Sequence, residues 1–386
     1  MMAGTESARM SGLSKTLSEL AHYRKVAQTL RDASGRAPPP ERDGPLVEIE
    51  DFGPNPGNLR MLVHAPETLA KRPALVVVLH GCTQTAQAFD AGSGWSALAD
   101  LHGFALLYPE QKSANNANTC FSWFDPAHTT RGKGEAGSIR NMIERMAVDL
   151  DIDRDRIFVT GLSAGGAMTN VMLAAYPEVF AAGAVIAGLP YGSARNVHEA
   201  FRSMFSGASR SAHDWGALVR EASPHGGPWP RVSIWHGEAD ATVVPSNAQE
   251  IVKQWSDVHA LPVHATSQET HGLHHLRQWR DGMGELRMEE HLIAGMDHGA
   301  PLTSAEGEGV GLAGPFMLDV GISSTLEIAR FFGLVAGPAQ SAGDEAQAQS
   351  RRAKRAPAPV EHPQQALLSS VEKTIAEALR KAGLLR

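Results

Sequence analysis

Hydrophobic residues along the chain gather in short runs that end at glycine-containing turns. Apolar runs of strand length end at a turn or loop in four places, at residues 74–79, 157–160, 231–237 and 286–293. A different period, that of an α-helix, separates the apolar residues Ile139, Met142, Ile143, Met146 and Leu150. These patterns predict buried strands and at least one helix that packs on a sheet.

The second run leads straight into a glycine-rich turn and then into a helix of small residues. Its sequence Ile-Phe-Val-Thr at 157–160 is followed by Gly-Leu-Ser-Ala-Gly-Gly at 161–166 and by the predicted helix 167–175. Such a sharp strand-to-helix turn exposes one serine and needs glycine on both sides of it. We therefore predict that Ser163 is a catalytic nucleophile.

A serine hydroxyl is a weak nucleophile, so it needs a histidine base and a carboxylate that orients the histidine. With this type of elbow the partners follow in the order serine, acid, histidine. Asp240 follows the apolar run 231–237, and His298 lies between two glycines after the run 286–293. We predict Asp240 as the acid and His298 as the base, with Glu238 and Asp297 as rival acids.

Several other histidines compete for attention, because the chain contains 17 of them. His271, His274 and His275 form a group that resembles a metal motif, but no cysteine or acidic ligands stand at matching spacing. We predict a solvated loop here, with no metal site.

Ester or amide hydrolysis also needs backbone N–H groups that stabilise the oxyanion of the intermediate. One donor is expected at Ala164, directly after the serine. The other is expected at Cys82, in the loop that follows the apolar run 74–79.

Six separated blocks of the sequence now carry a family resemblance. They are His80-Gly-Cys-Thr-Gln84, Tyr108-Pro-Glu-Gln111, Cys120-Phe-Ser-Trp-Phe124, Gly161-Leu-Ser-Ala-Gly-Gly166, Ala187-Gly-Leu-Pro-Tyr-Gly192 and Gly314-Pro-Phe-Met317. Together they resemble the esterase family of short-chain polyhydroxybutyrate depolymerases, over residues 59–334. The resemblance implies an α/β-hydrolase fold, with a mostly parallel central sheet and helices on both faces.

The resemblance also implies an activity. It is that of a cofactor-free serine esterase that acts on short poly- or oligo(3-hydroxyalkanoates), such as 3-hydroxybutyrate oligomers. Feruloyl and acetylxylan esterases are similar enough to stay as alternatives, and a non-catalytic binding protein with the same fold is a further one. A peptidase is a weaker alternative, since the same residues cleave amides.

Further expectations depend on the same blocks. Trp123 and Tyr191 are predicted to contact the substrate, although a core role suits each aromatic ring equally well. Cys82 and Cys120 both flank the predicted active-site mouth, and an oxidising compartment would favour a disulfide between them. The alternative is two buried free thiols.

Composition fits an enzyme with a large core and narrows the partners. The 386 residues are 42% hydrophobic, and no apolar stretch approaches the length of a membrane span. The formal net charge of -7 argues against a nucleic-acid partner. Residues 1–30 lack the pattern of a Sec signal peptide, which favours the cytoplasm, whereas the family resemblance implies secretion.

Shifts in composition divide the chain. We predict an N-terminal amphipathic helical segment at 1–36, a proline-rich linker at 37–45 and the catalytic domain at 46–336. A disordered linker at 337–363 and a C-terminal amphipathic helix at 364–386 are predicted to follow. The sequence leaves open whether this last helix docks on the body, pairs with the N-terminal helix or forms homo-oligomers.

Overall fold

The computed structural model describes residues 44–304 and 310–336. The predicted N-terminal helix and C-terminal helix lie outside the described residues, as do the linker at 337–363 and almost all of the linker at 37–45. Every helix and strand reported below belongs to the predicted catalytic domain.

One large sheet organises the described residues. Its strands run in the order β1-β2-β4-β3-β5-β6-β7-β10-β9-β8. The strands are β1 (Val47–Ile49), β2 (Arg60–His64), β3 (Leu75–Leu79), β4 (Ala105–Glu110), β5 (Ile157–Leu162), β6 (Ala182–Ile186), β7 (Arg231–Gly237), β8 (Ser267–His271), β9 (His274–Arg280) and β10 (Leu286–Ile293). A separate small parallel pair joins β11 (Ala300–Leu302) to β12 (Met317–Asp319).

The strands from β4 to β10 in this order are parallel, and the antiparallel strands lie at the two edges. The expected mostly parallel sheet is therefore confirmed. Parallel strands buried on both faces read as continuous apolar runs, which is why β3 is Leu-Val-Val-Val-Leu with every residue buried.

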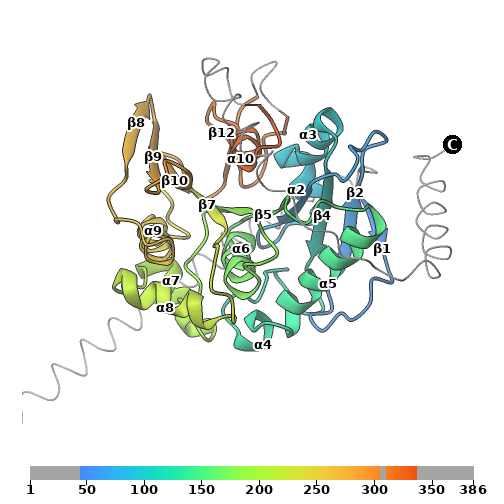
Figure 1. Ribbon diagram of the computed structural model, residues 1–386, viewed down its shortest axis with the longest axis horizontal. Coiled ribbons are helices and arrows are strands. Elements are labelled where there is room, and N and C mark those ends of the chain that lie inside the picture. The colour runs from blue at the N-terminus through green and yellow to red at the C-terminus, as the bar shows by residue number, and fades with distance from the viewer. Residues whose placement is uncertain (1–43, 305–309, 337–386) are drawn as a thin grey trace, which may run out of the picture. The chain divides into compact units, whose positions relative to one another are not determined.

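Helices cover both faces of this sheet, as predicted (Figure 1). They are α2 (Ala86–Ser93), α3 (Trp95–His102), α4 (Pro126–Thr129), α5 (Gly134–Asp149), α6 (Ala164–Ala175), α7 (Val197–Ser206), α8 (Ala212–Glu221), α9 (Ser246–Val258) and α10 (Ser324–Phe332). Side chains of α5, α6, α8 and α9 join one core cluster, and those of α2, α3 and α10 join the other. Alternate residues of β3 divide between the clusters, since Val77 joins the first and Val78 the second.

Three local predictions need adjustment. The elbow strand extends to Leu162 rather than Thr160, and the helix after it begins at Ala164 rather than Ala167, because Ser163 alone makes the turn. The segment with His271, His274 and His275 is no loop but the hairpin of β8 and β9. Its exposed polar strand residues are paired through the backbone, so they give no apolar signal in the sequence.

No helix in the described ranges has the length and apolarity that crossing a bilayer requires.

Candidate active site

Ser163 occupies a strained turn between β5 and α6. Its backbone angles are φ 57° and ψ −115°, a left-handed φ that side-chain-bearing residues rarely adopt. The turn brings the start of α6 close to the end of β3. A Cβ atom on Gly165 would lie 2.2 Å from the Leu79 carbonyl oxygen, so only glycine fits there. This packing holds the serine at the carboxyl edge of the sheet.

The loops after β7 and β10 are bonded to each other through the backbone. The Glu238 N–H donates to the Ile293 carbonyl at 3.0 Å, and the Ala239 N–H donates to the Met296 carbonyl at 2.9 Å. A Cβ atom on Gly237 would lie 2.3 Å from that same Met296 oxygen, so glycine allows the close approach. These bonds place Asp240 and His298 side by side although β7 and β10 are far apart in sequence.

The structure brings the three predicted triad side chains together. His298 Nε2 lies 2.9 Å from Ser163 Oγ, and His298 Nδ1 lies 2.7 Å from Asp240 Oδ2. All three residues are buried, with 9%, 8% and 3% of Ser163, His298 and Asp240 exposed. The rival acids Glu238 and Asp297 are both exposed, and Asp297 Oδ1 accepts the backbone N–H of His298 instead.

Hydrogen bonds keep Asp240 ionised despite its burial. Oδ1 accepts the N–H groups of Thr242 at 2.9 Å and Val243 at 2.8 Å. Burial raises the pKa of the carboxyl, but hydrogen bonds from His236 and His298 outweigh it and hold the pKa well below its usual range. An ionised acid can accept a proton-bearing Nδ1, which leaves Nε2 of His298 free to take a proton from Ser163.

The loop that carries Cys82 is tied to the loop before Phe121. Cys82 and Cys120 form a disulfide, and the Thr83 N–H donates to the Asn118 carbonyl at 2.6 Å. Thr83 itself has a left-handed φ of 62°, so these contacts stabilise a strained loop.

His80 orients the peptide group that precedes Cys82. The Gln111 N–H lies 3.1 Å from Nε2 of His80, which must therefore accept, so Nδ1 carries the proton and donates to the Gly81 carbonyl at 2.7 Å. Burial also lowers the pKa of His80, which favours this neutral form. In a trans peptide the N–H opposes the carbonyl, so the Cys82 N–H points away from the His80 ring.

The aromatic residues near the site differ in their surroundings. Trp123 is 7% exposed and packs edge to face on Phe124, whereas Tyr191 is only partly buried. Substrate contact by Trp123 and Tyr191 stays a prediction. A ring that we did not predict as a site residue, Phe316, lies 6.1 Å from the His298 ring in an edge-on arrangement. Phe316 belongs to the block Gly314–Met317 that resembles the family pattern, and this resemblance was the available sequence signal for a place near the site.

Of the three histidines on β8 and β9, His274 takes part in ring stacking, whereas His271 contacts Glu269 and His275 contacts Thr270. His274 Nε2 lies 2.8 Å from His291 Nδ1, and the His291 ring stacks on Trp235 with centroids 3.6 Å apart. Within the described ranges, no three His, Cys, Asp or Glu side chains are grouped so that they could hold a metal ion.

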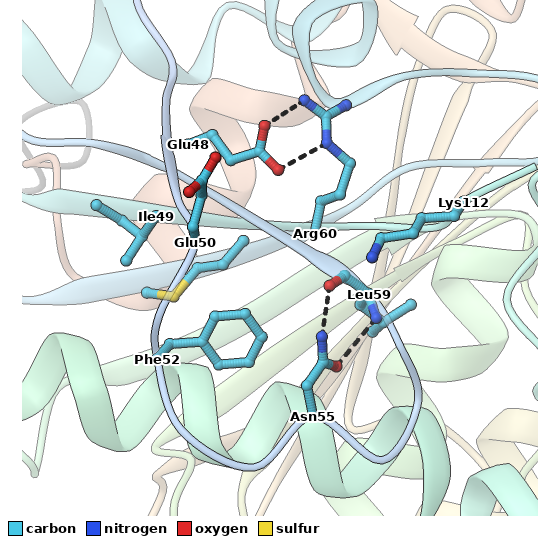
Figure 2. Close-up of a pocket in the computed structure, with 9 residues that line it drawn as sticks. Glu48, Ile49, Glu50, Phe52, Asn55, Leu59, Arg60 and Lys112 are labelled. Atoms are coloured by element: carbon cyan, nitrogen blue, oxygen red, sulfur yellow. Dashed lines mark hydrogen bonds and ion pairs between the residues drawn. The ribbon is translucent and has the colours of Figure 1, made fainter.

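A pocket of about 180 Å³ lies elsewhere, at the β1–β2 edge of the sheet (Figure 2). Most of its charged and polar side chains already have protein partners. Arg60 pairs with Glu48, Lys112 donates to Asn58, and Asn55 bonds the backbone of Leu59. The pocket shares no lining residue with the triad, so we assign no substrate to it.

Comparison with known proteins identifies the family. A model of the family described as esterase PHB depolymerase matches residues 60–273. Poly(3-hydroxyalkanoate) depolymerase C of Paucimonas lemoignei is 44% identical over 292 residues, which cover 75% of this chain and 70% of that protein. The chain belongs to the PHB depolymerase esterase family.

Other members of this comparison are carbohydrate esterases by name. Probable acetylxylan esterase A of Aspergillus flavus is 39% identical over 224 residues, covering 56% of this chain and 72% of that protein. Among solved structures, an acetyl xylan esterase from Aspergillus awamori has a TM-score of 0.65 and 27% identity, covering 76% of this chain and 100% of that one. The α/β-hydrolase fold and the class of carboxylic ester hydrolase are thus shared with close relatives.

Proposed function

We propose that this PHB depolymerase family member is a serine esterase that cleaves the ester bonds of short poly- or oligo(3-hydroxyalkanoates). The observation that carries the proposal is the buried chain of hydrogen bonds from Ser163 through His298 to Asp240. The substrate class rests on the 44% identity to the Paucimonas lemoignei depolymerase.

Acylation begins when His298 Nε2 takes the proton of Ser163 Oγ as the oxygen attacks the ester carbonyl carbon. Asp240 holds the imidazolium that forms, and it does so without taking the proton. The carbonyl oxygen becomes an oxyanion, which the Cys82 and Ala164 N–H groups stabilise. Ala164 begins α6, so the positive end of the helix dipole adds to this stabilisation.

Collapse of the intermediate expels the alcohol, which receives its proton from His298. The acyl group stays on Ser163 until His298 deprotonates a water molecule that attacks the same carbon. The products are the free 3-hydroxy acid unit and the restored serine. Neither step requires a metal or an organic cofactor, because every proton moves between Ser163, His298, water and substrate.

An acetylxylan-type esterase is the second candidate. It is favoured by the relative from Aspergillus flavus and by the solved structure from Aspergillus awamori. The same triad serves both substrates, so the difference must reside in the substrate-binding surface rather than in the catalytic residues.

A panel of soluble substrates separates the two candidates. Purified protein is incubated with 3-hydroxybutyrate trimer, acetylated xylan and methyl ferulate, and the released acid is measured for wild type and Ser163→Ala. Trimer cleavage that the variant lacks supports the proposal. Cleavage of acetylated xylan or methyl ferulate alone transfers the function to carbohydrate esters, and no cleavage of any substrate contradicts both candidates.

A further inference from the structure

A second histidine contacts the acid of the triad from within the sheet. His236 is the residue before the last of β7, and its side chain is fully buried. Its Nε2 atom lies 2.7 Å from the Val243 carbonyl oxygen and 3.3 Å from Asp240 Oδ2. A carbonyl oxygen can only accept, so Nε2 must carry a proton, which it donates to Val243 while it faces Asp240 Oδ2.

This contact adds to the donors that surround the Asp240 carboxylate. Oδ1 accepts two backbone N–H groups of the turn that follows, Oδ2 accepts from His298 Nδ1, and His236 Nε2 lies 3.3 Å from Oδ2. A carboxylate has about four lone-pair directions, so three hydrogen bonds and the nearby His236 N–H surround both oxygens of Asp240. Rotation of the carboxylate would break several of these bonds at once, so its orientation toward His298 is defined.

The hydrogen bond from His236 to the Val243 carbonyl constrains the same turn. The Val243 N–H donates to Asp240 Oδ1, while the Val243 carbonyl accepts from His236. The His236 imidazole, near the end of β7, therefore contacts both Asp240 at the start of the turn and Val243 at its end. His236 touches neither Ser163 nor the atoms that react, so any effect on catalysis must pass through Asp240.

From this geometry we infer that His236 is a positioning residue of the triad, which holds Asp240 Oδ2 directed at His298 Nδ1. The inference rests on the proposed esterase function. It extends the catalytic arrangement by one residue, which the sequence pattern predicts only as part of a buried strand.

Charged groups of the neighbouring strands lie behind His236. Glu290 of β10 is buried and ion-paired with Arg277 of β9, on the same face of the sheet as His236. Burial raises the pKa of the Glu290 carboxyl, and Arg277 and His236 oppose that rise. Within the described part of the chain, His236 Nδ1 and Glu290 Oε1 are buried without a hydrogen-bond partner. The bonds that orient the ring are therefore those made by Nε2.

Two substitutions of similar size test which ring nitrogen matters. The amide nitrogen of His236→Gln reaches the place of Nε2, whereas that of His236→Asn reaches only the place of Nδ1. We measure kcat and KM with p-nitrophenyl butyrate, together with the melting temperature, for both variants and for His236→Phe.

A misplacement of about 1 Å in a catalytic group costs up to ~10²-fold in rate. We therefore expect kcat to fall about 10- to 100-fold in His236→Phe and His236→Asn, with KM changed less than about twofold. His236→Gln should regain most of the loss. Equal kcat in Gln and Asn variants of equal stability would overturn the inference, as would wild-type kcat in His236→Phe.

A double-mutant cycle shows whether the effect passes through Asp240. In the background Asp240→Asn, the added change His236→Asn should lower kcat by less than about twofold, because the group that it orients is already impaired. Independent, multiplying losses would overturn the inference. The Asn variant also keeps the test open if His236→Phe does not fold.

A histidine with the same kind of bond outside the triad gives the matched control. His259 Nε2 lies 3.1 Å from the Pro230 carbonyl oxygen, so His259→Asn removes a comparable bond and should leave kcat unchanged. The variant Ser163→Ala makes a failure of the proposed esterase function distinguishable from a failure of the role assigned to His236. Full turnover in Ser163→Ala would remove the proposed function itself, whereas an inactive Ser163→Ala with a fully active His236→Asn would remove only the role of His236.

Discussion

His298 Nε2 lies 2.9 Å from Ser163 Oγ, although 135 residues separate the two in the chain. The strand order explains the meeting, because β6 and β7 lie between β5 and β10 and all four strands are parallel. Their carboxyl ends therefore reach one edge of the sheet, where the connecting loops converge.

The first prediction concerns this pair. Ser163→Ala and His298→Ala should each lower kcat for p-nitrophenyl butyrate by about 10⁴-fold or more, because triad members act as a unit. The circular dichroism spectrum should not change, since each variant removes atoms from a site at the edge of the core. Combining both changes should add little. Turnover near the wild-type level in either variant would contradict the assigned roles.

The second prediction distinguishes the acid Asp240 from Asp297, the residue that precedes His298 in the chain. Asp240→Asn should reduce kcat by about 10⁴-fold, because the amide cannot support the required histidine tautomer and imidazolium. Asp297→Asn keeps the oxygen that accepts the His298 N–H and should retain activity. Steady-state kinetics of the two variants decide the matter, and a larger loss in Asp297→Asn would reverse the assignment.

The third prediction concerns the disulfide between Cys82 and Cys120, which are 38 residues apart in the sequence. The chain-entropy estimate for a loop of this length is about 4 kcal/mol of stability. The double variant Cys82→Ser/Cys120→Ser should therefore unfold at lower denaturant concentration, and kcat should fall because the loop that holds the Cys82 N–H loosens. Unfolding of wild type with and without a reducing agent provides the comparison. Identical curves for oxidised protein and double variant would contradict the prediction.

The fourth prediction is a pH dependence of stability. Burial is the largest cause that lowers the pKa of His259, from 6.5 to about 4. The folded state thus disfavours the protonated imidazole, so the unfolded state binds more protons between these values. The contribution of His259 to the free energy of unfolding should be fully present above pH 6.5 and should be lost as the pH drops toward 4.

The contribution of one such group has a slope of up to about 1.4 kcal/mol per pH unit. His259→Gln should reduce the slope of the unfolding free energy in this window, as measured by urea denaturation at several pH values. His213→Gln, at an exposed imidazole, is the control. An unchanged slope in His259→Gln would show that other groups cause the acid sensitivity.

Local sequence was enough to predict the elbow and the strands that lead to it. The turn at Ser163 is specified by neighbours within three residues, since glycines on either side permit the backbone strain and the close contact with Leu79. The apolar runs likewise reflect burial of parallel strands on both faces. The hairpin of β8 and β9 was not predicted because β8 is exposed throughout and most of β9 is only partly buried, so the two strands carry little apolar signal.

The sequence by itself therefore determined the nature of the chemistry: a serine at a sharp turn, acidic and histidine candidates in the required order, and an α/β architecture. Only the tertiary structure decided which candidates meet. Asp240 is buried against His298, whereas Asp297, which precedes His298 in the chain, is exposed. His236 reaches the Asp240 carboxylate from inside the sheet. The reason is physical: the direction of a side chain at a strand end depends on strand order and on bonds between distant loops, and neither is encoded within a short segment.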